Sequence, residues 1–216
     1  MMYALSTDVS HAKENADIYD AHLIEFDGFM DVTFFAPDMG YQSQQGAPGV
    51  IEYYGNLEWI AGRDHLCTTS MGWLLLSRRM VRVLEEVGPF RHRLIPTVIY
   101  AERIKHLVYS GYPRRRTWHS VTDPALKNED FVILQLLERT DCLDRERTLV
   151  KGVPFHQCGE EFLAQEDAEP LVLRPPPGGF PPVFSVPELL YYCYTEEARQ
   201  ACEQAGLKGL WWRPQP

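Results

Sequence analysis

The sequence predicts an α+β fold built on a mixed, largely antiparallel sheet with a few amphipathic helices. Two segments, 74–96 and 192–214, share one strand–helix–strand outline. Between them, residues 131–137 (FVILQLL) form the apolar run that best suits a fully buried strand. Because strands and helices do not alternate regularly elsewhere in the chain, a doubly wound parallel fold is disfavoured.

Both strand–helix–strand modules carry the same signals at the ends of their helices. They align without a gap at an offset of 118 residues. Ser77 and Thr195 precede the helices and are expected to accept a hydrogen bond from a free N–H group of the first turn. Gly88 and Gly206 follow the helices and suit the left-handed conformation that ends many helices. We therefore expect one helix between each pair of signals.

Each expected helix has an apolar stripe with i, i+3, i+4, i+7 spacing. The two stripes comprise Met80, Val83, Leu84 and Val87 in the first helix, and Ala198, Ala201, Cys202 and Ala205 in the second. The side chains of the second stripe are small, so that helix can lie close to the surface that supports it.

The charges of the first helix run against its dipole. Arg78, Arg79 and Arg82 crowd its N-terminus, while Glu85 and Glu86 lie near its C-terminus. The dipole favours the opposite arrangement. We therefore expect tertiary contacts or a partner to place this helix. If the arginines face solvent, the basic segment becomes a candidate surface for a partner.

Outside the modules the expected elements are short. They are a strand at 3–6, a turn or helix within 8–20, one or two strands within 23–35, a loop at 37–49, a loop at 109–120 and a strand at 171–173. Residues 50–60 (VIEYYGNLEWI) predict a β-hairpin with Gly55-Asn56 as its turn. The stretch 175–182 (PPPGGFPP) is a rigid connector too short to separate domains, so we expect a single domain over 1–216.

Length and composition are those of an ordinary globular chain of 216 residues, with 45% hydrophobic and 24% charged residues. No apolar run approaches the roughly 18 residues that a membrane span needs. The N-terminus has no basic region followed by an apolar one, as a signal peptide would. Five cysteines without paired spacing fit reduced thiols. Together these features favour a cytoplasmic location.

Charge is distributed unevenly along the chain. The net charge of −9 combines −9 over residues 1–60, +7 over 61–116 and −7 over 117–216. The basic middle either pairs with acidic neighbours inside the fold or leaves an acidic N-terminal surface that steers a basic partner.

The sequence lacks the common catalytic signatures, such as G-x-S-x-G, Walker, G-x-G-x-x-G and H-E-x-x-H motifs. Three pairs remain as candidates: His156 with Cys158 as a nucleophile, His119 with Asp123 as a base, and Asp141 with Asp144 as cation ligands. For the last pair, a structural turn holding Arg145 or Arg147 is the favoured interpretation. No cofactor or metal is expected.

The segment Tyr112–Trp118 combines basic and aromatic residues, since Arg114, Arg115 and Arg116 stand between Tyr112 and Trp118. Arginines contact phosphates and aromatic rings stack on bases, so an RNA-binding module is a further alternative. The acidic total and the shortness of this segment disfavour a nucleic-acid partner.

Several motifs, in order and spacing, resemble immunity protein family eleven of bacterial polymorphic toxin systems. They are Leu76-Ser77, Gly88-Pro89, Leu94-Ile-Pro96, Asp141-Cys-Leu-Asp144, Phe184 and Gly206-Leu-Lys-Gly-Leu210-Trp211. The resemblance covers about 70–216. It departs at Thr148 and Thr195, where the family often has Ser.

The resemblance implies a non-catalytic immunity protein that binds a cognate protein toxin encoded by an adjacent gene. If that toxin has a basic cleft, acidic residues of this chain can take the place of its substrate's phosphates. The candidate toxin-binding residues form two acidic groups. They are Glu25, Asp27, Asp31 and Asp38 in the N-terminal part, and Glu160, Glu161, Glu166, Asp167 and Glu169 further on. The alternative is a small enzyme that uses Cys158 or Asp141/Asp144.

Overall fold

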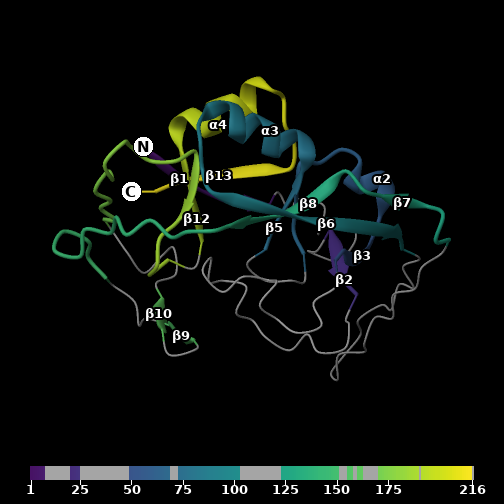
Figure 1. The fold of residues 1–216 in the computed structure, drawn as a ribbon, viewed down its shortest axis with the longest axis horizontal. Helices are drawn as coiled ribbons and strands as arrows, with labels where there is room; N and C mark the ends of the chain where they lie inside the picture. Colours follow the sequence, from purple (N-terminus) through teal and green to yellow (C-terminus); the bar gives the residue numbers. More distant parts are fainter. Residues whose placement is uncertain are drawn as a thin grey trace, which may run out of the picture.

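The computed structural model describes most of the chain. The described residues are 1–7, 20–24, 49–68, 73–102, 123–150, 155–157, 160–162, 170–189 and 191–215. Within them, strands form two main sheets and a separate β-hairpin, and the helices are α2 (Leu57–Ile60), α3 (Arg78–Val87) and α4 (Glu196–Gln204). Figure 1 shows α3 and α4 side by side above the strands. The predicted α+β class is confirmed.

The larger sheet has the order β2-β3-β6-β8-β5-β4, with β7 pairing to β6. Its strands are β2 (Ala21–Leu23), β3 (Ile51–Gly55), β4 (His65–Leu66), β5 (Leu74–Ser77), β6 (His92–Ala101), β7 (Lys127–Asn128) and β8 (Phe131–Leu136). Only β3 and β6 pair in parallel within this sheet, and the other neighbours are antiparallel. This is the mixed, largely antiparallel sheet that the sequence predicts.

The two ends of the larger sheet meet. Ala21, at the β2 end, forms an isolated bridge with Thr68, just after β4. The N–H groups of Asp20 and Ala21 also donate to the Cys67 carbonyl, at 2.7 and 3.2 Å. The sheet therefore curls back on itself, because these contacts join its two edge strands.

Strand β8 lies at the centre of the core. All six of its residues are buried, as the apolar run predicts. Phe131 and Ile133 join the cluster on one face of the sheet, together with Tyr53 and Ile99. The alternate residues, such as Leu134, face the other way and pack in a cluster with α3 and α4. Burial on both faces explains why this strand reads as continuously apolar.

The smaller sheet has the order β11-β12-β1-β13 and is antiparallel throughout. Its strands are β1 (Met2–Thr7), β11 (Val183–Ser185), β12 (Tyr192–Thr195) and β13 (Leu210–Pro214). The separate hairpin joins β9 (Phe155–Gln157) to β10 (Glu160–Phe162).

The likeness of the two modules extends to how their strands pair. In the first module, β5 and β6 do not pair with each other, because both pair antiparallel with β8 between them. In the second module, β12 and β13 flank β1 in the same way. Both modules are therefore split β–α–β units with an antiparallel strand inserted.

The helix caps follow the prediction at three of the four positions. The Ser77 hydroxyl accepts from the Met80 N–H at 3.0 Å, and the Thr195 hydroxyl accepts from the Ala198 N–H at 3.2 Å. Gly206 has φ +65°, the expected left-handed conformation. Gly88 instead has an extended backbone, because it precedes Pro89 and the residue before a proline is pushed away from helical conformations.

The apolar stripe of α3 is rotated slightly from the predicted one. Met80 and Leu84 are fully buried as expected, whereas Val81 is buried and Val83 and Val87 are only partly covered. The second stripe agrees at Ala198 and Cys202, which are buried against the same cluster.

Two predicted elements are wrong. Residues 50–60 are not a hairpin: Asn56 caps the short helix α2 by accepting from the Trp59 N–H at 3.2 Å, and β3 pairs with β2 and β6 instead. The segment 171–173 forms a single bridge, between Leu173 and Leu143. Its other backbone hydrogen bonds go to the turn around Asp144, so no strand ladder develops.

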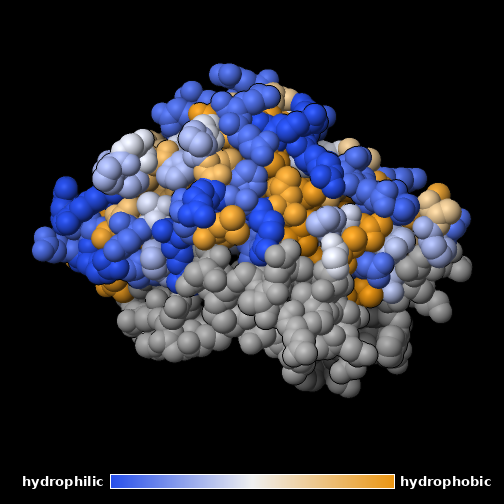
Figure 2. Space-filling model, in the orientation of Figure 1, coloured by the Kyte–Doolittle hydropathy of each residue, from blue (hydrophilic) through white to orange (hydrophobic). Residues whose placement is uncertain are grey.

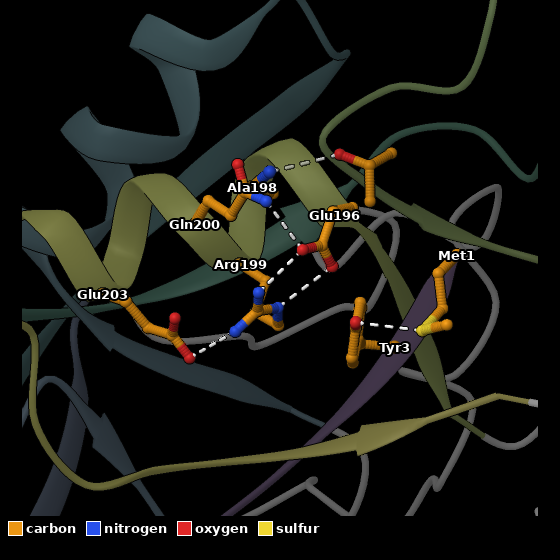
Figure 3. Close-up of polar contacts among 8 residues, drawn as sticks. Met1, Tyr3, Glu196, Ala198, Arg199, Gln200 and Glu203 are labelled. Carbon is orange, nitrogen blue, oxygen red and sulfur yellow. Dashed lines mark hydrogen bonds and ion pairs between the residues drawn. The ribbon is translucent and has the colours of Figure 1, made fainter.

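A polar network ties β1 to the beginning of α4. Figure 3 shows Arg199 between Glu196 and Glu203, with Tyr3 of β1 nearby. The Arg199 guanidinium lies 5.1 Å from the centre of the Tyr3 ring, a cation–π arrangement. Its hydrogen bonds lower the pKa of Glu196 to about 2, which keeps a negative charge at the helix N-terminus. None of the described helices is long and apolar enough to cross a membrane.

Candidate functional site

A cavity of about 740 Å³ opens where α3 begins. Its walls are the turn between α2 and β4, the first turns of α3, the residues before β8 and Lys208 after α4. Side chains of Val81, Leu94 and Phe131 supply apolar surface to it. Figure 2 shows strongly hydrophilic residues beside hydrophobic ones on the surface between α3 and α2. The cavity therefore combines an apolar floor with a polar rim.

The floor of the cavity is anchored by the buried carboxylate of Asp64. The Ser77 hydroxyl donates to it at 2.6 Å, and the Lys208 N–H donates to its other oxygen at 2.9 Å. The backbone follows the same path: the Asp64 N–H donates to the Lys208 carbonyl, and the Ser77 N–H donates to the Asp64 carbonyl, both at 2.8 Å. Three separate segments are thereby held at fixed positions around the cavity.

A second buried carboxylate, that of Asp20, supports the α2 wall. It accepts from the Trp59 indole N–H at 3.2 Å and from the Cys67 N–H at 2.8 Å. The Arg63 Nε lies 3.6 Å from it, and the guanidinium stacks 4.9 Å from the centre of the Trp59 ring. Arg63 also lines the cavity, but its positive charge is neutralised inside the fold by the Asp20 carboxylate.

The rim carries four exposed cationic side chains. They are Arg78, Arg79, Arg82 and Lys208. The Arg78 Nε donates to the Glu129 carbonyl at 3.5 Å, and Arg79 donates to the Ala205 carbonyl. The side chains of Arg82 and Lys208 form no hydrogen bond or ion pair within the described part of the chain. We call these four side chains the cationic rim.

The position of Arg79 explains why the charges of α3 oppose its own dipole. Ala205 is the C-cap of α4, where carbonyl groups lack helical partners. An arginine there satisfies one of them and complements the negative end of the α4 dipole. The N-terminus of α3 is basic because it lies beside the C-terminus of α4.

The described lining of the cavity holds five basic side chains and three acidic ones, so the basic residues are in excess. Glu85 is engaged by His92, whose Nε2 lies 3.2 Å from its carboxylate. Asp130 is exposed, and its carbonyl accepts from the Arg78 N–H at 2.8 Å. Arginines held in this way match the geometry of planar oxyanions, which they bind through two parallel N–H donors. The chemistry that the cavity suits is the binding of an anion.

The acidic residues predicted to bind a toxin lie mostly outside the described residues. Those outside are Glu25, Asp27, Asp31, Asp38, Glu166, Asp167 and Glu169. Glu160 and Glu161 lie in β10, opposite Gln157 and His156 of β9. The described residues therefore bring no acidic surface together from these predictions, and they reveal the cationic rim instead.

Asp141 and Asp144 belong to a structural turn. Asp144 is buried and accepts from the N–H groups of Glu146 and Arg147, both at 3.2 Å. The guanidinium of Arg174, at 2.8 Å, lowers the pKa of the Asp144 carboxyl. The favoured interpretation as a structural turn is confirmed. Arg145 pairs with Asp141 as predicted, whereas Arg174, and not Arg147, supplies the guanidinium that pairs with Asp144. No group of three or more metal-binding side chains occurs among the described residues.

Asp141 itself is exposed and lies 3.5 Å from Arg145, which also pairs with Glu188. None of the four described cysteines forms a disulfide bond. Burial raises the pKa of Cys142 to about 11 and that of Cys202 to about 12, and it raises the pKa of Cys193 further. These thiols are protonated near neutral pH and pack as small apolar side chains.

The remaining candidates lie outside the described residues: Cys158, His119 and Arg114, Arg115 and Arg116. Asp123 is described, and its carboxylate accepts from the Ala125 N–H at 2.9 Å within a turn. Sequence reasoning missed Asp64 and Lys208 as parts of a site. The signal that pointed toward it was the unusual charge order at the start of α3.

Searches against protein-family models and curated proteins found no match to this chain.

Proposed function

We propose that this protein is a non-catalytic immunity protein that binds a cognate bacterial protein toxin in the cytoplasm and neutralises it. The observation that carries the proposal is the cationic rim. Arg82 and Lys208 have no partner within the described residues, although they stand near Arg78 and Arg79 around one cavity. Concentrating like charges destabilises a folded chain unless a partner of opposite charge compensates for them.

Of the groups on which the enzymatic alternative depends, Asp141 is exposed and paired with Arg145, Asp144 has a structural task, and Cys158 lies outside the described residues. Asp144 is occupied by two N–H groups and by Arg174. The thiols of Cys142, Cys193 and Cys202 are buried and protonated. These assignments favour binding over catalysis. The resemblance to immunity protein family eleven over about 70–216 adds the class of partner, a toxin encoded beside the chain.

Co-expression with the product of the adjacent gene tests the proposal. We expect this chain to relieve the growth defect that the product causes, and to co-purify with it in a one-to-one complex. Complexes of this kind bury about 1,200–2,000 Å² in total. Unrelieved toxicity together with failure to co-purify would remove the basis of the proposal.

Two substitutions separate binding from catalysis in the same assay. Cys158→Ala removes the candidate nucleophile, and Asp141→Asn removes an exposed carboxylate without touching the buried Asp144. Both variants should protect cells as well as the original chain does. Loss of protection by a variant that still binds the toxin with unchanged affinity would favour the enzymatic alternative.

Two double variants test whether the predicted acidic residues bind the toxin, because each removes two negative charges from one of the two acidic groups. Glu160→Gln/Glu161→Gln changes the β10 strand, and Asp27→Asn/Asp31→Asn changes the N-terminal group. A toxin that presents a basic cleft should bind one of these variants more weakly. A toxin that presents an acidic surface should instead respond to substitutions in the cationic rim.

A further inference from the structure

We propose that the cavity at the start of α3 binds an acidic segment of a partner protein, with carboxylates on the cationic rim and an apolar side chain against the floor. The inference rests on the proposed function and deepens it. It names the surface that is used and the chemistry that this surface recognises.

The rim is pre-organised for carboxylates. Arg78 and Arg79 are each tied to a backbone carbonyl, of Glu129 and Ala205, which orients their guanidinium groups without neutralising them. A guanidinium that is already held in place loses less conformational entropy when it binds a carboxylate. Arg82, one turn further along α3, and Lys208 supply two more charges, and neither side chain forms a hydrogen bond or ion pair with a described residue.

The base beneath the rim is rigid. Asp64 connects the residue that caps α3, Ser77, to the segment that follows α4 through Lys208. Ser77 belongs to the first split β–α–β unit and Lys208 to the second. The cavity therefore forms where the two units pack together. A site built this way keeps its charges at fixed spacing, and a partner segment would be selected by the spacing of its own charges.

Size and lining decide between kinds of anionic ligand. At about 740 Å³ the cavity is within the range of roughly 300–1,000 Å³ that is typical of ligand pockets, so it accepts a short segment and not a folded domain. Among the described residues that line the cavity, Phe131 is the only aromatic one, and it is 2% exposed. Bases of a nucleic acid therefore find no exposed ring to stack on, whereas an aliphatic side chain can contact Leu94, which is only partly buried.

Fluorescence anisotropy with the full chain tests the inference. The probe is a short fluorescein-labelled peptide of alternating Glu and Leu, and the control probe has Gln in place of Glu. The Glu peptide should bind, the Gln peptide should not, and binding should weaken as salt rises from about 50 to about 500 mM.

Matched variants locate the binding. Arg78→Gln/Arg82→Gln should weaken the affinity for the Glu peptide by about tenfold or more. Arg91→Gln/Arg147→Gln removes the same charge from exposed positions that do not line the cavity, and should change affinity by less than about twofold. Circular dichroism and thermal unfolding verify that each variant folds. Equal effects of the two double variants would overturn the inference.

Competition and the cognate partner complete the test. Oligouridylate and ATP are titrated as competitors. If either binds more tightly than the Glu peptide and loses affinity in R78Q/R82Q, the cavity is a nucleotide site and the inference is wrong. Failure of the original chain to bind the adjacent gene product contradicts the proposed function, while the peptide titration still tests the cavity. A product that binds the original chain and R78Q/R82Q equally well contradicts only the inference.

Discussion

The Ser77 hydroxyl joins the N-cap of α3 to the buried carboxylate of Asp64. The hydroxyl oxygen accepts a hydrogen bond from the Met80 N–H at 3.0 Å, and the hydroxyl donates a hydrogen bond to the Asp64 carboxylate at 2.6 Å. Asp64 in turn accepts from the Lys208 N–H at 2.9 Å. One hydroxyl therefore fixes both the start of a helix and its position against the other module. Among the described residues, the Thr195 hydroxyl at the start of α4 forms only the capping bond to the Ala198 N–H.

Replacing Ser77 by Ala should destabilise the protein more than replacing Thr195 by Ala. Loss of a helix cap costs about 1 kcal/mol. The Ser77 change also leaves a buried carboxylate with one donor fewer, so we expect a total of about 2–3 kcal/mol against about 1 kcal/mol for Thr195→Ala. Urea denaturation followed by circular dichroism measures both free energies of unfolding. Equal losses would mean that the bond to Asp64 contributes nothing.

Asp64 and Ser77 should be energetically coupled. In a double-mutant cycle of Asp64→Ala and Ser77→Ala, the second change costs less once the first has been made, because the shared hydrogen bond is already gone. We expect a coupling free energy of about 1–2 kcal/mol. The cycle of Asp64→Ala with Thr195→Ala is the control and should be additive to within about 0.5 kcal/mol. Additivity in both cycles would show that the short contact is energetically neutral.

Local signals in the sequence predicted much of the fold because they act over a few residues. The caps at Ser77 and Thr195 reach only three positions along the chain. The signal at Asn56 was ambiguous, since Asn suits both a tight turn and a helix cap. In the structure Asn56 is the N-cap of α2. Gly88 failed as a left-handed residue because the following proline restricts it.

The candidate site could not be predicted in the same way, because its contacts are distant in sequence. Ser77 and Asp64 are 13 positions apart, and Asp64 and Lys208 are 144 apart. No periodicity or spacing rule links such residues. The bridge between Ala21 and Thr68 that curls the larger sheet is likewise a product of tertiary packing. The reversed charges of α3 were the one local anomaly, and they marked the place where the two modules meet.

Stability should fall as the pH drops from about 6.5 to about 4, because of His65. Burial, followed by the nearby charge of Arg63, lowers the pKa of His65 from 6.5 to about 4. The folded state therefore binds this proton less readily than the unfolded state. The stabilising effect is complete above pH 6.5 and is lost as the pH falls toward 4, by roughly 3 kcal/mol at most.

His65→Asn isolates this contribution, because the variant has no group that titrates at that position. Unfolding free energies of both proteins are measured by urea denaturation between pH 8 and pH 4. Above pH 7 the two curves should run parallel, and between about 6.5 and 4 the original chain should lose stability more steeply. Parallel curves over the whole range would show that His65 has the same proton affinity in both states.

Gly209 should tolerate an added methyl group much less well than Gly178 does. Both residues have positive φ angles, +78° and +97°, so an alanine is strained at either position. At Gly209 the new Cβ would also lie 3.2 Å from the His65 carbonyl oxygen and 3.2 Å from Arg63, whereas nothing lies within 4 Å at Gly178. We expect Gly178→Ala to cost about 1 kcal/mol and Gly209→Ala about 2–4 kcal/mol. Because Gly209 adjoins Lys208, only Gly209→Ala should also weaken binding of the Glu peptide. Equal losses of stability, measured by urea denaturation, would show that the segment after α4 is less closely packed against Arg63 than the structure places it.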